Sequence, residues 1–268
     1  MIAFPLAKIN LGLSVISKRP DGFHNLETIF YPLPVCDVLE IVPSKETRMV
    51  NSGLTIPGSP ANNLVLRAYH LVKKNYSQVG PLEIHLHKAI PMGAGLGGGS
   101  SDAANILMLV DRCFNLKISD EDMKLYALEM GSDCPFFLQS LPCFASGRGE
   151  ILEPLNLDLS GYSILLIHPE IHVETARAFM RIRPEAPAHP LRESILEPLT
   201  EWKNTIRNAF ETPVFEEHPS LKKIKEKLYD AGALYAAMTG SGSTIYGIFQ
   251  KSHLPEIHVE KATQTHIR

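Results

Sequence analysis

The chain has 268 residues, 44% of them hydrophobic, a formal net charge of -3, and four cysteines that show no C-x-x-C spacing. This length suits one large domain or two smaller domains that share a cleft. The cysteine pattern argues against a disulfide framework or a zinc site. The negative charge argues against a nucleic-acid-binding protein. There is no run of about 18 apolar residues and no basic, apolar leader, so we predict neither a membrane span nor a signal peptide and expect a cytoplasmic protein.

The first half of the chain, residues 1–155, is rich in predicted strands. In chain order, the patterns predict strands over residues 2–16, 26–30 and 38–42, a helix over 63–74, a strand over 82–87, and helices over 101–114 and 119–130. Ser119, with Asp122 three residues later, is close to a capping box, and Gly131 is placed to end the last of these helices. Residues 45–61 show little pattern.

The second half begins with an apolar stretch that predicts a strand over residues 162–167. Helices are predicted over 174–183, 192–210 and 220–231, and two short strands over 234–238 and 244–249. Three prolines between residues 183 and 190 predict a surface loop. We find no internal repeat and no low-complexity tract.

Residues 91–103, Pro-Met-Gly-Ala-Gly-Leu-Gly-Gly-Gly-Ser-Ser-Asp-Ala, join a predicted strand to a predicted helix. Glycine lacks the Cβ that would hold a phosphate away from the backbone and permits positive φ, so successive N–H groups can converge on one oxyanion. We expect the two serines to cap the helix, whose positive end then faces the same point. A flexible linker would instead carry scattered glycine and serine between polar stretches. The loop therefore predicts a phosphate site.

This loop differs from the phosphate loops of several large enzyme classes. A Walker A loop ends in Gly-Lys-Ser or Gly-Lys-Thr, whereas Gly98 and Gly99 precede Ser100 here. Gly93, Gly95 and Gly98 satisfy G-x-G-x-x-G, but no acidic residue ends a second strand about 20 residues later, as a nicotinamide-binding fold requires. The lysine strand and His-Arg-Asp triplet of protein kinases are also missing. The motif thus indicates phosphate without naming a reaction.

A second glycine loop, Thr-Gly-Ser-Gly-Ser-Thr at residues 239–244, lies between two apolar strands. Glycine weakens a strand, so its presence between two strands requires an explanation. A tight hairpin turn is one explanation. Beside the first loop, the second can also pack on the phosphate cradle or line the far side of a cleft. Together the two loops favour a nucleotide held at a domain interface.

Two further segments carry charged residues in apolar surroundings. Lys8 and Asn10 project from one face of the first strand, while Ile9 and Leu11 point to the other. A lysine in an apolar strand needs a partner, although a solvated lysine is the common case. Asp133 lies between Gly131-Ser132 and a Pro-Phe-Phe run, which can hold a carboxylate at the edge of a core, and a helix-to-strand turn explains this spacing equally well.

In this order, the segments resemble the GHMP kinases, the superfamily of galactokinase, homoserine kinase, mevalonate kinase and phosphomevalonate kinase. The resemblance covers the whole chain. It implies a two-domain α+β fold, with a ribosomal-S5-like ATP-binding domain over residues 1–155, a ferredoxin-like substrate-binding domain over 156–268, and the active site in the cleft between them. The match is closer to the branch that phosphorylates the 2-hydroxyl of 4-diphosphocytidyl-2-C-methyl-D-erythritol, on the methylerythritol phosphate route to isoprenoid precursors. It rests on residues 5–13, 21–24, 90–104 and 239–243, and on Asp133 with Pro135.

The resemblance also implies roles for individual residues. Asp133 would take the proton of the acceptor hydroxyl, and Lys8 would keep that aspartate ionised and offset charge on the transferring phosphoryl group. Asn10 would orient the acceptor. The cytidine end would contact Phe23, His24, Thr175 and Phe179. Phe23 departs from the tyrosine of many relatives, which keeps an aromatic ring but loses a phenolic hydroxyl.

ATP and magnesium are the implied cosubstrate and cofactor. The residues implied to bind ATP are Asn63, Leu64, Val65, Lys88, Pro91, Met92, Gly93, Ala94, Gly95, Leu96, Gly97, Gly98, Gly99, Ser100, Ser101, Gly240, Ser241 and Gly242. Magnesium would bridge the phosphate oxygens, and its protein ligands stay open because Asp102 is explained equally well as a helix-start acid. His85 and His87 share a strand face but have no third ligand, so we predict no metal site there.

Three alternatives remain open at this point, and so does the oligomeric state. Another GHMP kinase, of the homoserine or mevalonate type, would have no obvious use for Gly22-Phe23-His24. A nicotinamide-dependent oxidoreductase would bind NAD in preference to ATP. A non-catalytic nucleotide sensor would not require both Lys8 and Asp133. In each case the expected partner is a small molecule, with no nucleic acid and no membrane.

Overall fold

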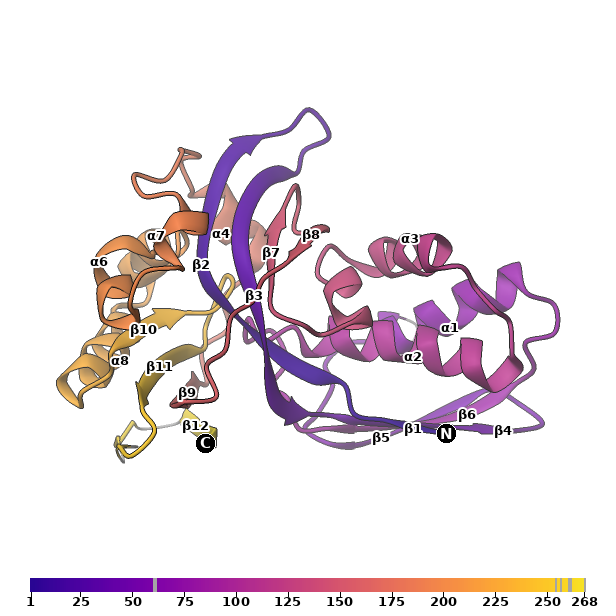
Figure 1. Cartoon of the computed structure of the whole chain (residues 1–268). Helices are drawn as coiled ribbons and strands as arrows, with labels where there is room; N and C mark the ends of the chain where they lie inside the picture. Colours follow the sequence, from indigo (N-terminus) through magenta and orange to yellow (C-terminus); the bar gives the residue numbers. More distant parts are fainter. Residues whose placement is uncertain (60–61, 254, 256, 260–261, 268) are drawn as a thin grey trace. The chain divides into compact units, whose positions relative to one another are not determined.

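The computed structural model describes residues 1–59, 62–253, 255, 257–259 and 262–267, and it mixes helices and sheets as expected. The chain divides into two compact units that alternate along the sequence (Figure 1). The first unit comprises Met1–Lys8, Pro32–Met92 and Gly97–Ser140, and the second comprises Ile9–Tyr31, Gly93–Leu96 and Leu141–Arg268. The functional division at residue 155 stays a prediction. Within the described ranges, no helix combines the length and the apolar character needed to cross a bilayer.

The first unit contains a four-stranded sheet in the order β1-β4-β6-β5. Its strands are β1 (Ile2–Ala3), β4 (Val38–Pro43), β5 (Arg48–Gly53) and β6 (Leu82–Lys88). β5 runs parallel to β6, and the other neighbours are antiparallel. β5 falls in the stretch where the sequence shows little pattern, because a largely exposed edge strand has no buried face to impose alternation.

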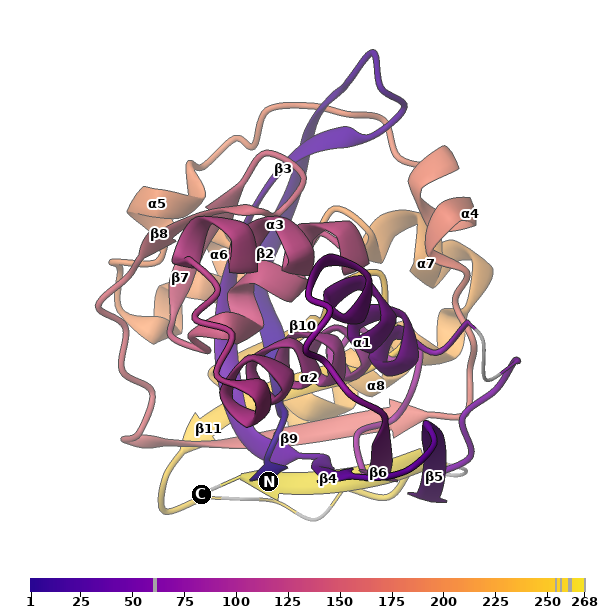
Figure 2. The same cartoon turned by 90° about the vertical axis from the view of Figure 1, so that its right-hand side faces the viewer.

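Helices cover one face of this sheet (Figure 2). They are α1 (Leu64–Asn75), α2 (Gly98–Phe114), α3 (Asp120–Met130) and a 3₁₀ helix (Cys134–Leu138). Every second residue of β4 and β6 packs beneath them in one core with Val65, Ile106 and Ala127. The predicted capping box is confirmed at α3, where the Ser119 hydroxyl accepts from the Asp122 N–H at 3.1 Å and donates to its carboxylate at 2.9 Å.

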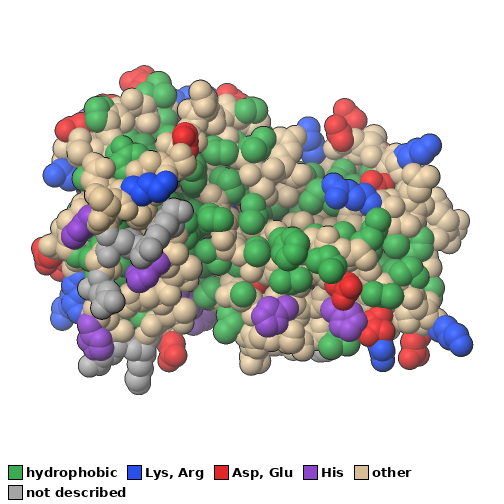
Figure 3. All heavy atoms as spheres, turned by 60° about the horizontal axis from the view of Figure 1, so that its bottom comes forward, with side chains coloured by type: hydrophobic (Ala, Val, Ile, Leu, Met, Phe, Trp, Pro, Cys, Tyr) green, Lys and Arg blue, Asp and Glu red, His purple; other side chains and the backbone are tan. Residues whose placement is uncertain are grey.

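The opposite face of the same sheet carries the alternate residues of each strand. Ile2, Val42 and Val50 are exposed there, and His85 pairs with Glu83 at 2.9 Å. These positions follow from the period of two: Leu39, Ile41, Ile84 and the other residues beneath the helices take the inward places. Figure 3 shows hydrophobic and histidine side chains at the surface of the chain.

The second unit contains an antiparallel sheet in the order β10-β11-β9-β12. Its strands are β9 (Tyr162–Pro169), β10 (Tyr235–Met238), β11 (Ile245–Gln250) and β12 (Ala262–Ile267). A further sheet, in the order β2-β3-β7-β8, is formed by β2 (Leu6–Lys18), β3 (His24–Cys36), β7 (Cys143–Ser146) and β8 (Ile151–Pro154). The single strand predicted over residues 2–16 is wrong: the chain leaves the strand at Phe4 and Pro5, since proline has no N–H for a ladder.

Short helices complete the second unit. They are α4 (Thr175–Met180), α5 (Leu191–Ser194), a 3₁₀ helix (Leu199–Glu201), α6 (Trp202–Thr205), α7 (Glu211–Glu217) and α8 (Pro219–Asp230). The continuous helix predicted over residues 192–210 is wrong. Pro198 disfavours helical backbone at Glu197, so the segment breaks into short pieces.

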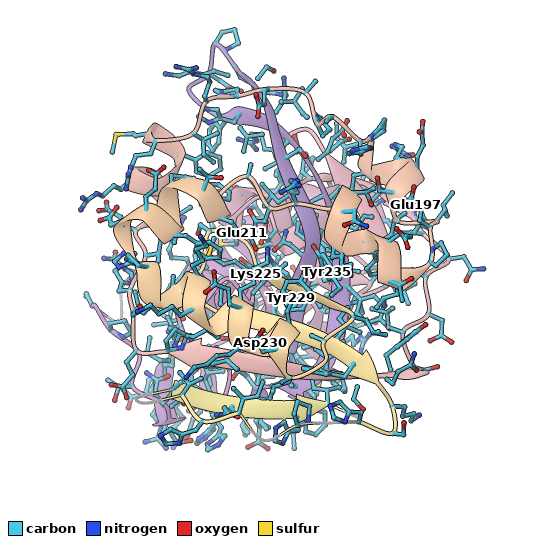
Figure 4. All side chains as sticks on the ribbon, turned by 90° about the vertical axis from the view of Figure 1, so that its left-hand side faces the viewer. Glu197, Glu211, Lys225, Tyr229, Asp230 and Tyr235 are labelled. Atoms are coloured by element: carbon cyan, nitrogen blue, oxygen red, sulfur yellow. The ribbon has the colours of Figure 1, made fainter. Side chains whose placement is uncertain are left out.

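Helices α7 and α8 hold the strand that leads into the second glycine loop (Figure 4). A carboxylate oxygen of Glu211 accepts from the N–H of Met238 at 2.8 Å, and the other oxygen accepts from Lys225 at 2.6 Å. The Asn208 amide donates to the carbonyls of Met238 at 2.7 Å and Gly240 at 2.8 Å. The backbone of the loop entrance is therefore satisfied by side chains from outside the sheet.

Asn208→Ala should destabilise the chain, because it removes the side-chain donor from one buried and one part-buried carbonyl group. We expect the free energy of unfolding to fall by about 2–4 kcal/mol, measured by urea denaturation. Asn204→Ala is the matched control, since Asn204 is exposed, and its effect should stay within about 0.5 kcal/mol. Equal effects of the two substitutions would contradict this assignment.

Candidate active site

The first glycine loop ends at a helix that begins earlier than the sequence predicts. α2 starts at Gly98, and Gly97 is its N-cap residue, with φ of 72°. Ser100 and Ser101 lie inside the first turn, so the prediction that the serines cap the helix is wrong. Glycine replaces them because the cap adopts a left-handed conformation, which serine adopts only with strain. The N–H groups of the first turn have no acceptor within the helix and form a place for an anion.

Gly97 also has no room for a side chain. A Cβ built on Gly97 would lie 2.6 Å from the ring of Phe137 and 3.2 Å from Cε of Lys8. Phe137 belongs to the 3₁₀ helix, and Lys8 to the start of β2. The absence of a side chain thus lets a lysine lie directly against the start of an anion-binding helix.

Lys8 forms an ion pair with Asp133 at 3.3 Å. The Lys8 side chain is only 3% exposed and that of Asp133 is 35% exposed, so the carboxylate can reach a ligand while the lysine stays inside. Gly131 ends α3, and Asp133 then begins the 3₁₀ helix. From the sequence alone, Lys8 could have been an ordinary solvated lysine. Its burial in the structure excludes that interpretation.

A buried group of three charges lies close to the same helix. Lys88 contacts one carboxylate oxygen of Asp37 and lies 2.8 Å from an oxygen of Asp102. The second oxygen of Asp37 accepts from the N–H groups of Ala89 and Ile90 at 2.6 and 2.9 Å. Two carboxylates thus share one ammonium group, and a Cβ on Gly98 would lie 3.2 Å from that ammonium nitrogen.

Asp102 has a pKa well above the ordinary range of an aspartate. Burial raises the pKa of Asp102 to about 7, the Asp37 carboxylate adds to the increase, and Lys88 opposes it. The other Asp102 oxygen and the Ser101 hydroxyl are buried without a hydrogen-bond partner among the described residues. Asp102 is therefore more than a helix-start acid.

A hollow of about 160 Å³ opens beside this group in the first unit. Its walls combine apolar side chains with amide groups, a lining suited to a flat nucleobase. Asn63 is the N-cap of α1, accepting from the Val65 N–H at 2.9 Å. Six of the residues predicted to bind ATP line the hollow: Asn63, Leu64, Val65, Lys88, Met92 and Gly99.

In the second unit, the second glycine loop packs on residues 93–96 of the first loop. The Thr239 hydroxyl lies 3.0 Å from the Gly95 carbonyl, and the Thr244 N–H donates to the Ala94 carbonyl at 3.3 Å. A Cβ on Gly95 would lie 2.1 Å from the Thr239 carbonyl oxygen, so only glycine permits this approach. The two loops are in backbone contact, one of the arrangements that the sequence allowed.

Thr239 also contacts Asn10. The Asn10 N–H donates to the Thr239 hydroxyl at 3.0 Å, and the two side chains lie 3.2 Å apart. The Asn10 amide donates to Thr28 at 2.9 Å, and Thr28 donates to the Gly12 carbonyl at 2.6 Å. Asn10 is buried, and its amide orientation is set by two threonines.

Three of the residues predicted to bind the cytidine end take part in two separate contacts, one of His24 with Phe179 and one of Thr175 with Ser241. His24 stacks on Phe179, with ring centroids 5.0 Å apart and planes at 19°, and Phe179 meets Phe210 edge to face. Burial and the charge of Lys18 lower the pKa of His24, so the neutral imidazole is favoured. Thr175 lies 2.8 Å from the Ser241 hydroxyl, which joins α4 to the second glycine loop.

Phe23 is 49% exposed and contacts Arg148 instead, whose guanidinium lies 4.3 Å from the ring centroid. Phe23 lies directly before β3, and His24 is the first residue of that strand.

Sequence reasoning missed Asp37, Thr28, Asn208 and Arg148. Asp37 stands in an apolar stretch, Val-Cys-Asp-Val-Leu, which is a detectable signal of the kind that drew attention to Lys8. Thr28 and Asn208 give no such signal, because polar residues in strands and turns are ordinary. Their partners lie 18 and 30 residues away in sequence.

Comparison with known proteins identifies the family. The model of the GHMP kinases N terminal domain matches residues 63–140, and that of the GHMP kinases C terminal domain matches residues 191–263. A curated relative from Bacteroides fragilis, named 4-diphosphocytidyl-2-C-methyl-D-erythritol kinase, is 49% identical over 253 residues, which are 93% of this chain and 92% of the relative. The chain belongs to the GHMP kinases.

Other GHMP kinases agree with this assignment. A relative of the same name from Cytophaga hutchinsonii is 51% identical over 250 residues, covering 93% of this chain and 92% of the relative. A crystal structure of 4-(cytidine 5'-diphospho)-2C-methyl-D-erythritol kinase matches with a TM-score of 0.79 and 33% identity over 92% of this chain and 90% of that one. Mevalonate kinase from Methanococcus jannaschii, at 13% identity and a TM-score of 0.66 over 100% of this chain and 98% of that one, shares the fold. This GHMP kinase is an ATP-dependent enzyme that phosphorylates a small molecule.

Gly97→Ala should destabilise this kinase, because alanine would adopt positive φ and overlap the Phe137 ring. We expect a loss of roughly 2 kcal/mol or more in the free energy of unfolding, measured by urea denaturation. Gly99→Ala is the control for stability: Gly99 is inside the helix, and its Cβ would meet only Leu64 at 3.8 Å. That substitution should be neutral or stabilise by up to about 1 kcal/mol, since alanine favours helix. A tolerated Gly97→Ala would overturn the close packing described.

Asp102 should make stability depend on pH. Its pKa is about 7 in the folded chain against an ordinary 3.8, so the folded state binds the proton more tightly than the unfolded state. Its stabilising contribution is therefore present below the unfolded pKa and is lost as pH rises toward 7, with a slope of at most ~1.4 kcal/mol per pH unit. Asp102→Asn removes this titration. In nucleotide-free, magnesium-free protein, urea unfolding should show that wild-type stability falls relative to the variant between about pH 5 and pH 7. A constant difference would contradict the assignment.

Proposed function

We propose that this GHMP kinase transfers the γ-phosphoryl group of ATP to the 2-hydroxyl of 4-diphosphocytidyl-2-C-methyl-D-erythritol, on the methylerythritol phosphate route to isoprenoid precursors. The observation that carries the proposal is the Lys8–Asp133 ion pair, 3.3 Å long, against Gly97, the N-cap of α2. Two relatives, 49% and 51% identical over 93% of the chain, bear the name of this kinase, which supports the choice of acceptor. We also propose a cytoplasmic location, because the reaction consumes ATP.

The acceptor is a tertiary alcohol, which is crowded and barely acidic, so it needs both positioning and a base. Asp133 accepts the hydroxyl proton as the oxygen attacks the γ-phosphorus. The bond from that phosphorus to the bridging oxygen breaks, and ADP leaves. Lys8 pairs with the Asp133 carboxylate and offsets negative charge on the phosphoryl group during transfer. Asn10, whose amide is held by Thr28 and Thr239, orients the acceptor.

The first turn of α2 binds the β- and γ-phosphates through its unpaired N–H groups. Magnesium supplies positive charge to the phosphate oxygens when it is bound. The described residues contain no group of three or more His, Cys, Asp or Glu side chains that could hold a metal. The buried Ser101 hydroxyl, which has no hydrogen-bond partner among these residues, is the protein oxygen that fits such an ion.

The two bases of the substrates have different surroundings. Adenine fits the hollow lined by Asn63, Leu64 and Val65, where an apolar wall and amide groups occur together. The cytidine end fits the aromatic residues of the second unit, where Phe179 and Phe23 offer stacking faces and His24 offers a polar edge. Thr175 adds a hydroxyl beside the second glycine loop.

Asp133→Asn should abolish most of the activity without unfolding the chain. Loss of a general base costs about 10²- to 10⁴-fold in rate, and we expect kcat to fall in that range with little change in the KM for ATP. Asp120→Asn is the matched control, since Asp120 is an exposed acid of the same unit. The measurement is ADP release from magnesium-ATP. A fully active Asp133→Asn variant would exclude Asp133 as the base.

The same assay tests the acceptor when homoserine and mevalonate are run beside the cytidine substrate. Turnover confined to the cytidine substrate would support the proposal. Turnover with one of the other acceptors would keep the kinase and reject the assignment of Phe23, His24 and Phe179.

A further inference from the structure

Two arginines of the second unit lie over phenylalanine rings, and only one of them donates side-chain hydrogen bonds to an acid. Arg192 lies 3.7 Å from the Phe144 centroid and donates two hydrogen bonds to the Glu153 carboxylate, at 2.9 and 2.5 Å. Arg148 lies 4.3 Å from the Phe23 centroid, and its nearest acid is Glu150, with Nε and Oε1 3.9 Å apart. That separation is beyond hydrogen-bond length. Among the described residues, no acceptor takes a hydrogen bond from the Arg148 guanidinium.

The exposures of the two side chains make this difference informative. The side chain of Arg192 is 51% exposed, whereas that of Arg148 is 23% exposed. Ser101 Oγ and one Asp102 oxygen are the buried polar side-chain atoms without a partner among the described residues, so the Arg148 nitrogens, which carry no hydrogen bond, reach solvent. Arg148 therefore keeps donors open to a ligand on a side chain that is partly sheltered, where an anion is bound more strongly than at the fully open surface.

The backbone around Arg148 is held in place. Gly147 and Gly149 have φ of 69° and 109°, and they form a tight turn between β7 and β8. The Gly147 carbonyl accepts from the Leu26 N–H at 2.8 Å, and the Arg148 N–H donates to the Glu150 carboxylate. The turn thus aims the side chain at the neighbouring hairpin.

Phe23 is held from its own side. Its N–H donates to Asp21 at 3.1 Å, and its carbonyl accepts from the Arg19 N–H at 2.8 Å. Arg19 pairs with Asp21 at 3.0 Å, so the nearest competing acid already has a cation. Burial opposes a lower pKa of Asp21, but the Phe23 N–H, the Arg19 guanidinium and, least of all, Arg148 lower it. The charged groups around Phe23 are thus Arg19, Asp21, Arg148 and Glu150.

We propose that Arg148 is a substrate-positioning residue that binds the diphosphate of a cytidine-diphosphate substrate while its flat face supports the Phe23 ring. This inference rests on the proposed function. A guanidinium that stacks through its face keeps its N–H donors at the edge, and that edge matches two oxygens of a phosphate. In this role, the guanidinium adds the polar contact that a phenylalanine in place of a tyrosine cannot make.

A series of three probes separates binding of the phosphates from support of the ring. Cytidine, CMP and CDP are titrated by calorimetry into the complete chain, whose nucleotide site is saturated with a non-hydrolysable ATP analogue. In the wild type, affinity should rise along the series. Arg148→Met should weaken CDP binding by about tenfold or more and cytidine binding by less than about twofold. Arg148→Lys, which keeps the charge, should recover part of the loss.

Arg192→Met is the matched control. It also removes an arginine that lies over a phenylalanine ring, but the charge of Arg192 is already paired with Glu153. It should leave all three affinities unchanged. In the kinase assay, Arg148→Met should raise the KM for the cytidine-diphosphate substrate and leave kcat and the KM for ATP near the wild-type values.

Other outcomes would overturn the proposal in distinguishable ways. Equal weakening of cytidine and CDP by Arg148→Met would reduce Arg148 to a support for Phe23. Unchanged affinities for all three probes would remove it from the site and leave the proposed function standing. A wild-type chain that binds neither cytidine nor CDP would reject the proposed function and this role together.

Discussion

The buried charge of Lys8 is the constraint on which the first unit's site depends. A lysine that is 3% exposed requires a counter-charge, and Asp133 supplies it because Gly131 ends α3 just before the 3₁₀ helix. The same 3₁₀ helix presses Phe137 against Gly97, which leaves room only for glycine at the cap of α2. The ion pair, the aromatic contact and the start of the anion-binding helix are therefore one packed arrangement. A substitution that disturbs one part of it also disturbs the packing of the others.

In the second unit, side-chain hydrogen bonds hold the second glycine loop in a similar way. Thr239 contacts Asn10 and Gly95, and the strand before it is held by Asn208 and Glu211. These side chains satisfy backbone groups that an isolated hairpin would leave to water. Such hydrogen bonds fix the backbone of the glycine loop without helical or strand structure, which suits the ligand-binding role proposed for it.

Polar groups that lack partners are concentrated where ligands are proposed to bind. The Ser101 hydroxyl and one Asp102 oxygen are buried without a hydrogen bond among the described residues, and the Arg148 guanidinium has unused donors. Elsewhere, comparable groups are satisfied: Arg192 pairs with Glu153, and Lys225 with Glu211. A buried polar group without a partner costs free energy, so it persists where a ligand completes it. This contrast supports both the nucleotide site and the role of Arg148.

The sequence by itself determined the regular elements with a buried face, the two glycine loops and the family. Strands β4 and β6 and helix α3 were predictable because periodicity and capping act between near neighbours. Tertiary structure decided the rest. It put Gly97 in place of a serine cap, broke the helix expected over residues 192–210, joined Lys8 to Asp133, and brought Asp37 and Asp102 to one lysine. These outcomes depend on contacts between residues far apart in the chain, and local sequence carries no record of which distant side chain will supply a charge or occupy a space.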